Sequence, residues 1–127
     1  MDHNSIILVI DDEPKNIFAL NLVLKSKGYK VLTCSSAKRG LQLLTQSDEI
    51  ALVLMDMMMP DMDGYEAIRT IRSSEHGYKD VGIIAVTAQA MNGDKEKCLQ
   101  AGADGYISKP IDIDLLIDQI SYFIKGK

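Results

Sequence analysis

Three short, continuous apolar runs constrain the fold more than any other feature of this chain: Ile6–Ile10, Ala51–Met55 and Gly82–Val86. They are rich in isoleucine, valine and leucine and do not alternate with polar residues, which is typical of parallel strands covered on both faces. Two weaker runs, Tyr29–Cys34 and Asp104–Ile107, complete a predicted set of five strands. A mainly parallel sheet is therefore expected.

Amphipathic segments of helical length separate these runs. The predicted helices are Lys15–Lys27, Ala37–Gln46 with a cap at Ser35 or Ser36, Gly64–Ser73, one that follows Asn92-Gly93-Asp94 and ends at Gly102, and one from Asp112 or Asp114 to about Ile124. Five successive strand-helix units predict right-handed crossovers that place helices on both faces of the sheet. The expected fold class is a doubly wound α/β fold, with residues 1–127 as a single domain.

Composition excludes several classes of function. The net charge is −4 at neutral pH, so the chain lacks the basic footprint of proteins that bind nucleic acid or anionic membranes. No apolar run approaches the ~20 residues needed to span a bilayer, and Met1–Asn4 does not resemble the start of a signal peptide. Cys34 and Cys98 show no metal-ligand spacing and are interpreted as small buried hydrophobic residues. A cytoplasmic protein without nucleic-acid or membrane contact is expected.

Polar residues follow four of the five predicted strands. Asp11 and Asp12 follow the first strand, Asp56 the third, Thr87 the fourth and Ser108-Lys109 the fifth. In open α/β sheets, ligands bind beyond the carboxyl ends of the strands, where the strand order reverses. These side chains are therefore expected to converge on one site.

Three neighbouring carboxylates indicate a cation. Like charges at close range raise one another's pKa values and destabilise the fold unless a positive charge joins them, and Lys109 can offset only one of them. Because no cysteine or histidine accompanies Asp11, Asp12 and Asp56, oxygen ligation points to Mg²⁺ or Mn²⁺ rather than zinc. This outlines a phosphoryl-transfer site with Asp56 as the nucleophile, Lys109 and the Thr87 hydroxyl on the phosphoryl oxygens, and space left by the small Ala88.

The residues that carry these features resemble a known family. Asp11-Asp12, the run from Met55 to Gly64, Thr87-Ala88 and Tyr106-Ile107-Ser108-Lys109-Pro110 resemble the receiver domain of two-component response regulators, and the likeness covers essentially the whole chain. The resemblance implies a flavodoxin-like fold with strand order 2-1-3-4-5. It also suggests, through Val86–Met91 and Gly102–Pro110, a receiver of the kind fused to hybrid histidine kinases.

The resemblance implies a role for each residue of the site. Asp56 matches the phosphoacceptor, Asp12 the direct ligand of Mg²⁺, and Asp11 a neighbour that acts through metal-bound water. Met58 matches a position whose backbone carbonyl binds the metal. Lys109 matches the phosphate-binding lysine, and its bond to Pro110 the peptide that is usually cis.

The resemblance further implies a phosphorylation-dependent switch. Thr87 is the switch hydroxyl, and Tyr106 is the aromatic side chain that rotates inward and remodels the face formed by the fourth helix, fifth strand and fifth helix. The phosphodonor would be a histidine kinase or a histidine phosphotransfer domain that docks around Asn16, Ile17 and Pro110. Met58 and Gln89 flank the site and are where control of the phosphorylated lifetime is expected. The cognate kinase, the output partner and the choice between a monomer and a phosphorylation-dependent dimer stay open.

Other functions fit the residues less well. A flavin-binding electron carrier shares the topology, but Asp12-Glu13-Pro14 would repel the flavin phosphate. A hydrolase with an aspartyl-phosphate intermediate needs a second carboxylate two residues after the nucleophile, where Met58 stands. An unphosphorylated binding module would not need the complete set of site residues. Asp61-Met62-Asp63-Gly64 does not match a calcium loop and is interpreted as a turn and helix cap.

Overall fold

The computed structural model describes residues 5–59, 62–75, 80–88 and 93–125. Strands and helices alternate along these residues, as the sequence predicts. In chain order they are β1 (Ile6–Ile10), α1 (Pro14–Ser26), β2 (Lys30–Cys34), α2 (Ala37–Gln46), β3 (Ile50–Asp56), α3 (Gly64–Arg72), β4 (Gly82–Thr87), α4 (Asp94–Ala101), β5 (Gly105–Ser108) and α5 (Ile113–Lys125).

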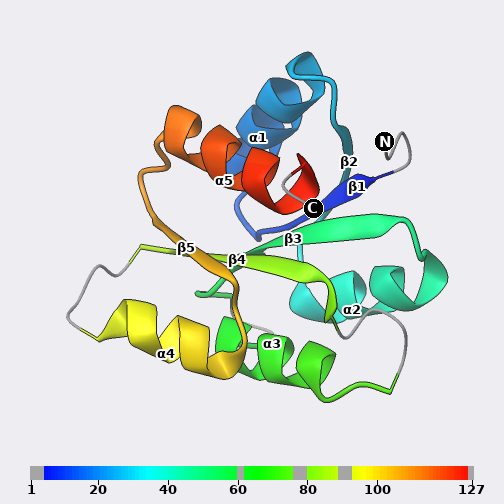
Figure 1. The fold of residues 1–127 in the computed structure, drawn as a ribbon, viewed down its shortest axis with the longest axis vertical. Coiled ribbons are helices and arrows are strands. Elements are labelled where there is room, and N and C mark those ends of the chain that lie inside the picture. The colour runs from blue at the N-terminus through cyan, green and yellow to red at the C-terminus, as the bar shows by residue number, and fades with distance from the viewer. Residues whose placement is uncertain (1–4, 60–61, 76–79, 89–92, 126–127) are drawn as a thin grey trace.

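The sheet has the order β2-β1-β3-β4-β5, and every pair of neighbouring strands is parallel. The chain runs from β1 outward to β2 and then crosses over to β3. Helices α1 and α5 cover one face of the sheet, and α2, α3 and α4 cover the other (Figure 1). This confirms the doubly wound α/β fold and the expected strand order.

The continuous apolar runs reflect burial on both faces. In β1, Ile7 and Val9 pack in the layer beneath α1 and α5, whereas Leu8 and Ile10 pack in the layer above α2, α3 and α4. Successive side chains of a strand point to opposite faces, so a strand covered on both sides needs apolar residues at every position. All four of these side chains are buried.

Polar residues mark the boundaries of several helices. Ser36 caps α2 by accepting a hydrogen bond from the Arg39 N–H, with an N–O distance of 3.1 Å. Asp63 caps α3 in the same way through the Glu66 N–H, at 2.8 Å, which confirms the interpretation of its segment as a helix cap. Asn92 lies outside the described residues.

None of the helices in the described part of the chain has the length and apolar character needed to cross a bilayer.

The sequence prediction placed some strand ends one residue early. Asp56 and Thr87 are the last residues of β3 and β4 rather than the first residues of the loops that follow. Asp56 lies opposite Val86, and Thr87 lies opposite Ser108. Ladder pairing therefore continues into both polar residues, and the strands themselves hold these side chains. Both cysteines, Cys34 and Cys98, are buried, as expected.

Gly64 begins α3 and lies close to the backbone of Met57. A Cβ atom at this position would lie 2.7 Å from the Met57 Cα and would also meet its sulfur. We expect Gly64→Ala to lower the free energy of unfolding by about 1 to 2 kcal/mol through overpacking, measured by urea denaturation. Glu66→Ala, at an exposed position of the same helix, should cost only a few tenths of a kcal/mol. Equal stability of the two variants would contradict this account of the close approach.

Candidate functional site

Three carboxylates converge at the carboxyl ends of the neighbouring strands β1 and β3. Asp11 and Asp12 follow β1, and Asp56 ends β3. Because Ile10 pairs with Met55, the residues that come next on the two strands lie beside one another. One carboxylate oxygen from each aspartate lies within 4.8 Å of the others. Asp11 and Asp56 are each only 3% exposed, whereas Asp12 is exposed.

Short-range hydrogen bonds orient the two buried carboxylates. One oxygen of Asp11 accepts from the Glu13 N–H at 2.8 Å, and the other accepts from the Asn16 amide at 3.4 Å. Asp56 Oδ1 accepts from the Met58 N–H at 3.0 Å. The backbone thus holds one oxygen of Asp56 and leaves Oδ2 directed at the other charges of the site.

Lys109 brings a positive charge to this cluster from the end of β5. Its Nζ lies 3.7 Å from Asp11 Oδ2 and 3.7 Å from Asp56 Oδ2. Its backbone N–H donates to the Thr87 carbonyl at 2.7 Å, which ties the end of β5 to the end of β4. The Lys109–Pro110 peptide bond is cis. Two buried carboxylates, one exposed carboxylate and one ammonium leave this cluster with excess negative charge.

The electrostatics of the cluster favour a bound divalent cation. Burial raises the pKa of Asp56 above its ordinary value, and the neighbouring Asp11 adds to this rise, while the Met58 N–H and the Lys109 ammonium oppose it. The three clustered side chains offer only oxygen ligands, the donor type that Mg²⁺ and Mn²⁺ prefer. The donor set and the uncompensated charge therefore fit such an ion.

Other predicted site residues lie around this cluster or apart from it. Thr87 is buried at the end of β4 and Ala88 is exposed beside it. Ile17 is half-buried on α1 and Pro110 is exposed after β5. Tyr106 is directed elsewhere, because its hydroxyl donates to Asp94 at 3.2 Å. Gln89 lies outside the described residues, and the Met58 side chain is exposed.

Sequence reasoning missed the partner of Tyr106. Asp94 is the first residue of α4, a position where a carboxylate is common because it interacts favourably with the helix dipole. Nothing in the local sequence indicates that this one is buried. Its other partner, Tyr65, lies 29 residues earlier in the chain.

A family model matches most of this sequence. The model for the response regulator receiver domain matches residues 7–121, which include Asp11, Asp56, Thr87 and Lys109. The chain belongs to this family. The match favours a phosphoacceptor of two-component signalling over a flavin-binding electron carrier or a hydrolase.

Known proteins similar to this receiver include histidine kinases. It is 40% identical over 108 residues to the sensor histidine kinase GacS of Pseudomonas protegens, covering 83% of this chain and 12% of the kinase. It is 37% identical over 122 residues to hybrid signal transduction histidine kinase I of Dictyostelium discoideum, covering 91% of this chain and 7% of the kinase. This receiver therefore spans about an eighth or less of the length of either relative.

A solved structure matches this receiver over nearly its whole length. It is the receiver domain of a sensor histidine kinase from Pseudomonas aeruginosa, described as having a magnesium ion coordinated in the active site cleft. The two chains are 36% identical with a TM-score of 0.85, and the match covers 95% of this chain and 98% of the other.

Proposed function

We propose that this receiver, with residues 1–127 as one domain, accepts a phosphoryl group on Asp56 from a phosphohistidine donor in a reaction that depends on Mg²⁺. The observation that carries the proposal is the environment of the Asp56 carboxylate. One oxygen is held by the Met58 N–H at 3.0 Å, and Oδ2 faces the Lys109 ammonium at 3.7 Å. A nucleophile oriented in this way, beside a cationic group that offsets phosphoryl charge, suits phosphoryl transfer.

The transfer step replaces one bond to phosphorus by another. Asp56 Oδ2 attacks the phosphorus of phosphohistidine and forms a P–O bond. The P–N bond breaks, and its electron pair moves to the ring nitrogen, which leaves as neutral imidazole when the other ring nitrogen carries a proton. The product is an aspartyl phosphate, a mixed anhydride that water can hydrolyse slowly, so the receiver would act as a switch with weak self-dephosphorylation.

The residues around Asp56 would divide the remaining tasks. Lys109 offsets charge on the phosphoryl oxygens, the Thr87 hydroxyl donates a hydrogen bond to one of them, and Ala88 leaves them room. Asp12 would hold Mg²⁺ directly, with Asp11 acting through water and Met58 through its carbonyl. When bound, the ion supplies positive charge that reduces repulsion between the carboxylates and the incoming phosphoryl group, and Mn²⁺ would substitute for it.

We further propose that phosphorylation is read out on the α4-β5-α5 face. Recruitment of Thr87 to the phosphoryl group would open space into which the Tyr106 ring turns. The donor would be a cytoplasmic histidine kinase or histidine phosphotransfer domain that docks around Asn16, Ile17 and Pro110. The similarity to receiver segments of kinases supports a donor of this class.

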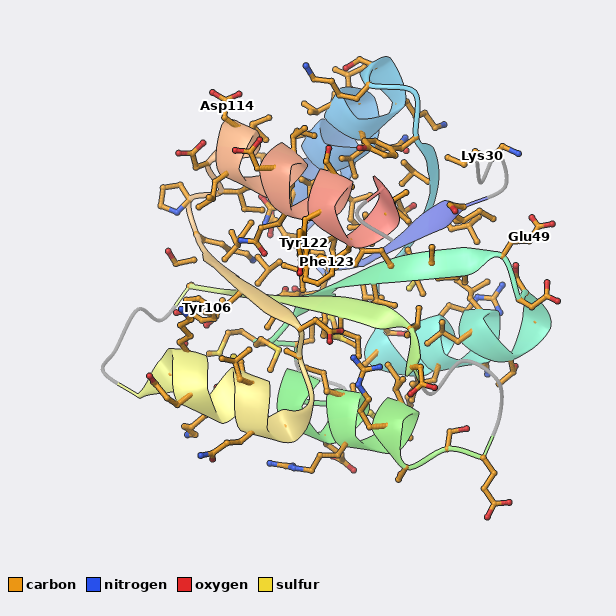
Figure 2. All side chains as sticks on the ribbon, viewed as in Figure 1. Lys30, Glu49, Tyr106, Asp114, Tyr122 and Phe123 are labelled. Atoms are coloured by element: carbon orange, nitrogen blue, oxygen red, sulfur yellow. The ribbon has the colours of Figure 1, made fainter. Side chains whose placement is uncertain are left out.

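The mass of the intact protein after incubation with acetyl phosphate and Mg²⁺ tests the proposal. We expect a gain of one phosphoryl group that disappears in Asp56→Asn and in the presence of EDTA. Asp114→Asn, a matched change at an exposed position of α5 (Figure 2), should gain the group as the wild type does. Absence of both the mass gain and a complex with beryllofluoride, a mimic of the phosphoryl group, would refute the proposal.

A further inference from the structure

One buried carboxylate outside the phosphoacceptor site binds two tyrosines from different elements. The Tyr65 hydroxyl, from the first turn of α3, donates to Asp94 Oδ1 at 2.7 Å. The Tyr106 hydroxyl, from β5, donates to Asp94 Oδ2 at 3.2 Å. Asp94 is only 7% exposed, and it opens α4. We call Tyr65, Asp94 and Tyr106 the two-tyrosine clamp.

The clamp is suited to hold side chains in one orientation. Hydrogen bonds to an ionised acceptor are roughly twice as strong as those between neutral groups, and a buried carboxylate that loses its donors is costly. Burial and the nearby Asp94 raise the pKa values of both tyrosines, so their hydroxyls stay protonated and continue to donate. A tyrosine side chain has two main rotatable bonds, so fixing its hydroxyl fixes its ring.

The backbone of Tyr106 is held separately from its ring. Its carbonyl accepts a hydrogen bond from the Gln119 amide of α5 at 3.2 Å, and it pairs with Ala85 in the ladder between β4 and β5. Figure 2 shows Tyr106 on the side of the sheet that α4 covers, near the start of that helix. Rotation of the ring therefore has to break its bond to Asp94 while the strand stays in place.

From this geometry we infer that Asp94 is a positioning residue, which sets the orientation of the Tyr106 ring through the clamp, with Tyr65 holding the carboxylate in place. The consequence for signalling rests on the proposed function. The inference includes the premise that a ring turned inward toward Thr87 gives up its bond to Asp94, so that the clamp favours the orientation seen here over the inward one. Weakening the clamp should raise the fraction of molecules with the ring turned inward. The apparent affinity for a phosphoryl group or its mimic should rise with that fraction, because such a ligand favours the inward state.

Asp94→Asn tests the inference, because it keeps the size of the side chain and removes its charge. The signals of ¹³C-labelled tyrosine rings in the full chain report the orientation, with Tyr106→Phe identifying the Tyr106 signals by their loss. We expect the Tyr106 signals to shift in Asp94→Asn without any ligand. In Asp94→Asn, the beryllofluoride concentration that half-saturates the protein in the presence of Mg²⁺ should fall about fivefold. This is the ratio expected when a charged hydrogen-bond acceptor becomes a neutral one.

Asp104→Asn is the matched control for a merely structural carboxylate. Asp104 binds Arg72 at 2.7 Å and the Ile83 N–H at 2.9 Å, so its loss should lower stability without moving the Tyr106 signals or the beryllofluoride midpoint. Should Asp94→Asn not fold, Tyr65→Phe removes one of the two donors of the carboxylate and must still shift the Tyr106 signals.

Each result decides a separate part of the inference. Unchanged Tyr106 signals in the Asp94→Asn variant would overturn the positioning role. Shifted signals with an unchanged beryllofluoride midpoint would overturn the link to phosphorylation. A wild type that forms no beryllofluoride complex would refute the proposed function, while the tyrosine signals would still decide whether Asp94 positions the ring.

Discussion

Asp56→Asn is expected to make this receiver more stable at neutral pH without divalent metal, by about 1.4 kcal/mol for each unit by which the fold raises the pKa of Asp56, although it abolishes the proposed phosphorylation. The change removes one of two buried negative charges and keeps the shape of the side chain. Lys109 is not left unpaired, since its ammonium still lies 3.7 Å from Asp11. Urea denaturation in EDTA measures the difference, with Asp114→Asn as a surface control that should change stability by less than about 0.5 kcal/mol.

The stability difference between Asp56→Asn and the wild type should increase with pH. The pKa of Asp56 is raised above its ordinary value of 3.8 by burial and by Asp11. Below that ordinary value the group is protonated in both the folded and the unfolded chain, so it costs the fold nothing. As the pH rises from 3.8 to the folded-state pKa, the unfolded chain has lost this proton while the folded chain still holds it, so the wild type loses stability. Above the folded-state pKa the loss is complete. The advantage of the asparagine variant should therefore grow from about pH 4 upward and then level off.

Mg²⁺ should reduce the stability advantage of Asp56→Asn over the wild type. An ion that binds the folded chain at 100 times its dissociation constant adds about 2.7 kcal/mol, and this gain requires the Asp56 carboxylate. We expect Mg²⁺ to stabilise the wild type clearly and Asp56→Asn little. Equal stabilisation of both proteins would show that Asp56 is not a metal ligand, and a wild type more stable than the variant in EDTA would contradict the account of buried repulsion.

The convergence of these carboxylates was predictable from the sequence because it depends on strand ends alone. Once Ile6–Ile10 and the run ending at Met55 are recognised as parallel strands, the rule for open α/β sheets brings Asp11 and Asp56 to one edge. The order of the strands does not follow from that rule, and its prediction depended on the family resemblance. The ends of β3 and β4 were placed one residue early because a polar residue at a strand end does not show whether ladder pairing continues.

The two-tyrosine clamp could not be predicted in the same way. Tyr65 and Asp94 are joined only because α3 and α4 lie side by side on one face of the sheet (Figure 1). That packing depends on the match of two helix surfaces and the reach of one side chain, which no local pattern encodes. A tyrosine early in a helix and an aspartate at a helix start each have an ordinary local explanation, so neither attracts attention by itself.

Arg72 forms a second such long-range connection, and its loss should destabilise the fold more than the loss of Gly64 does. It is the last residue of α3. Its guanidinium donates to the carbonyls of Gly102 at 2.9 Å and Val81 at 2.6 Å, and to Asp104 at 2.7 Å. The single group thus joins the end of α3 to the start of β4 and to the turn before β5.

We expect Arg72→Met to lower the free energy of unfolding by about 2 to 4 kcal/mol. Methionine replaces the apolar part of the side chain but removes the Arg72 donor from two carbonyls and from Asp104, which keeps its bond from the Ile83 N–H. Arg69→Met is the matched control, because Arg69 is exposed on the same helix and should change stability by less than about 0.5 kcal/mol. Thermal and urea unfolding of both variants gives the comparison.

Arg72→Lys separates the charge of this residue from its geometry. The ion pair with Asp104 is partly exposed, with side chains 22% and 41% accessible, and pairs of this kind contribute only about 0 to 1 kcal/mol. Lysine keeps the charge, but its single ammonium cannot reach three acceptors that a planar guanidinium spans. We therefore expect Arg72→Lys to lose most of the stability that Arg72→Met loses. If lysine restored wild-type stability, the charge would matter more than the bonds to the two carbonyls, and the role assigned to the guanidinium would be wrong.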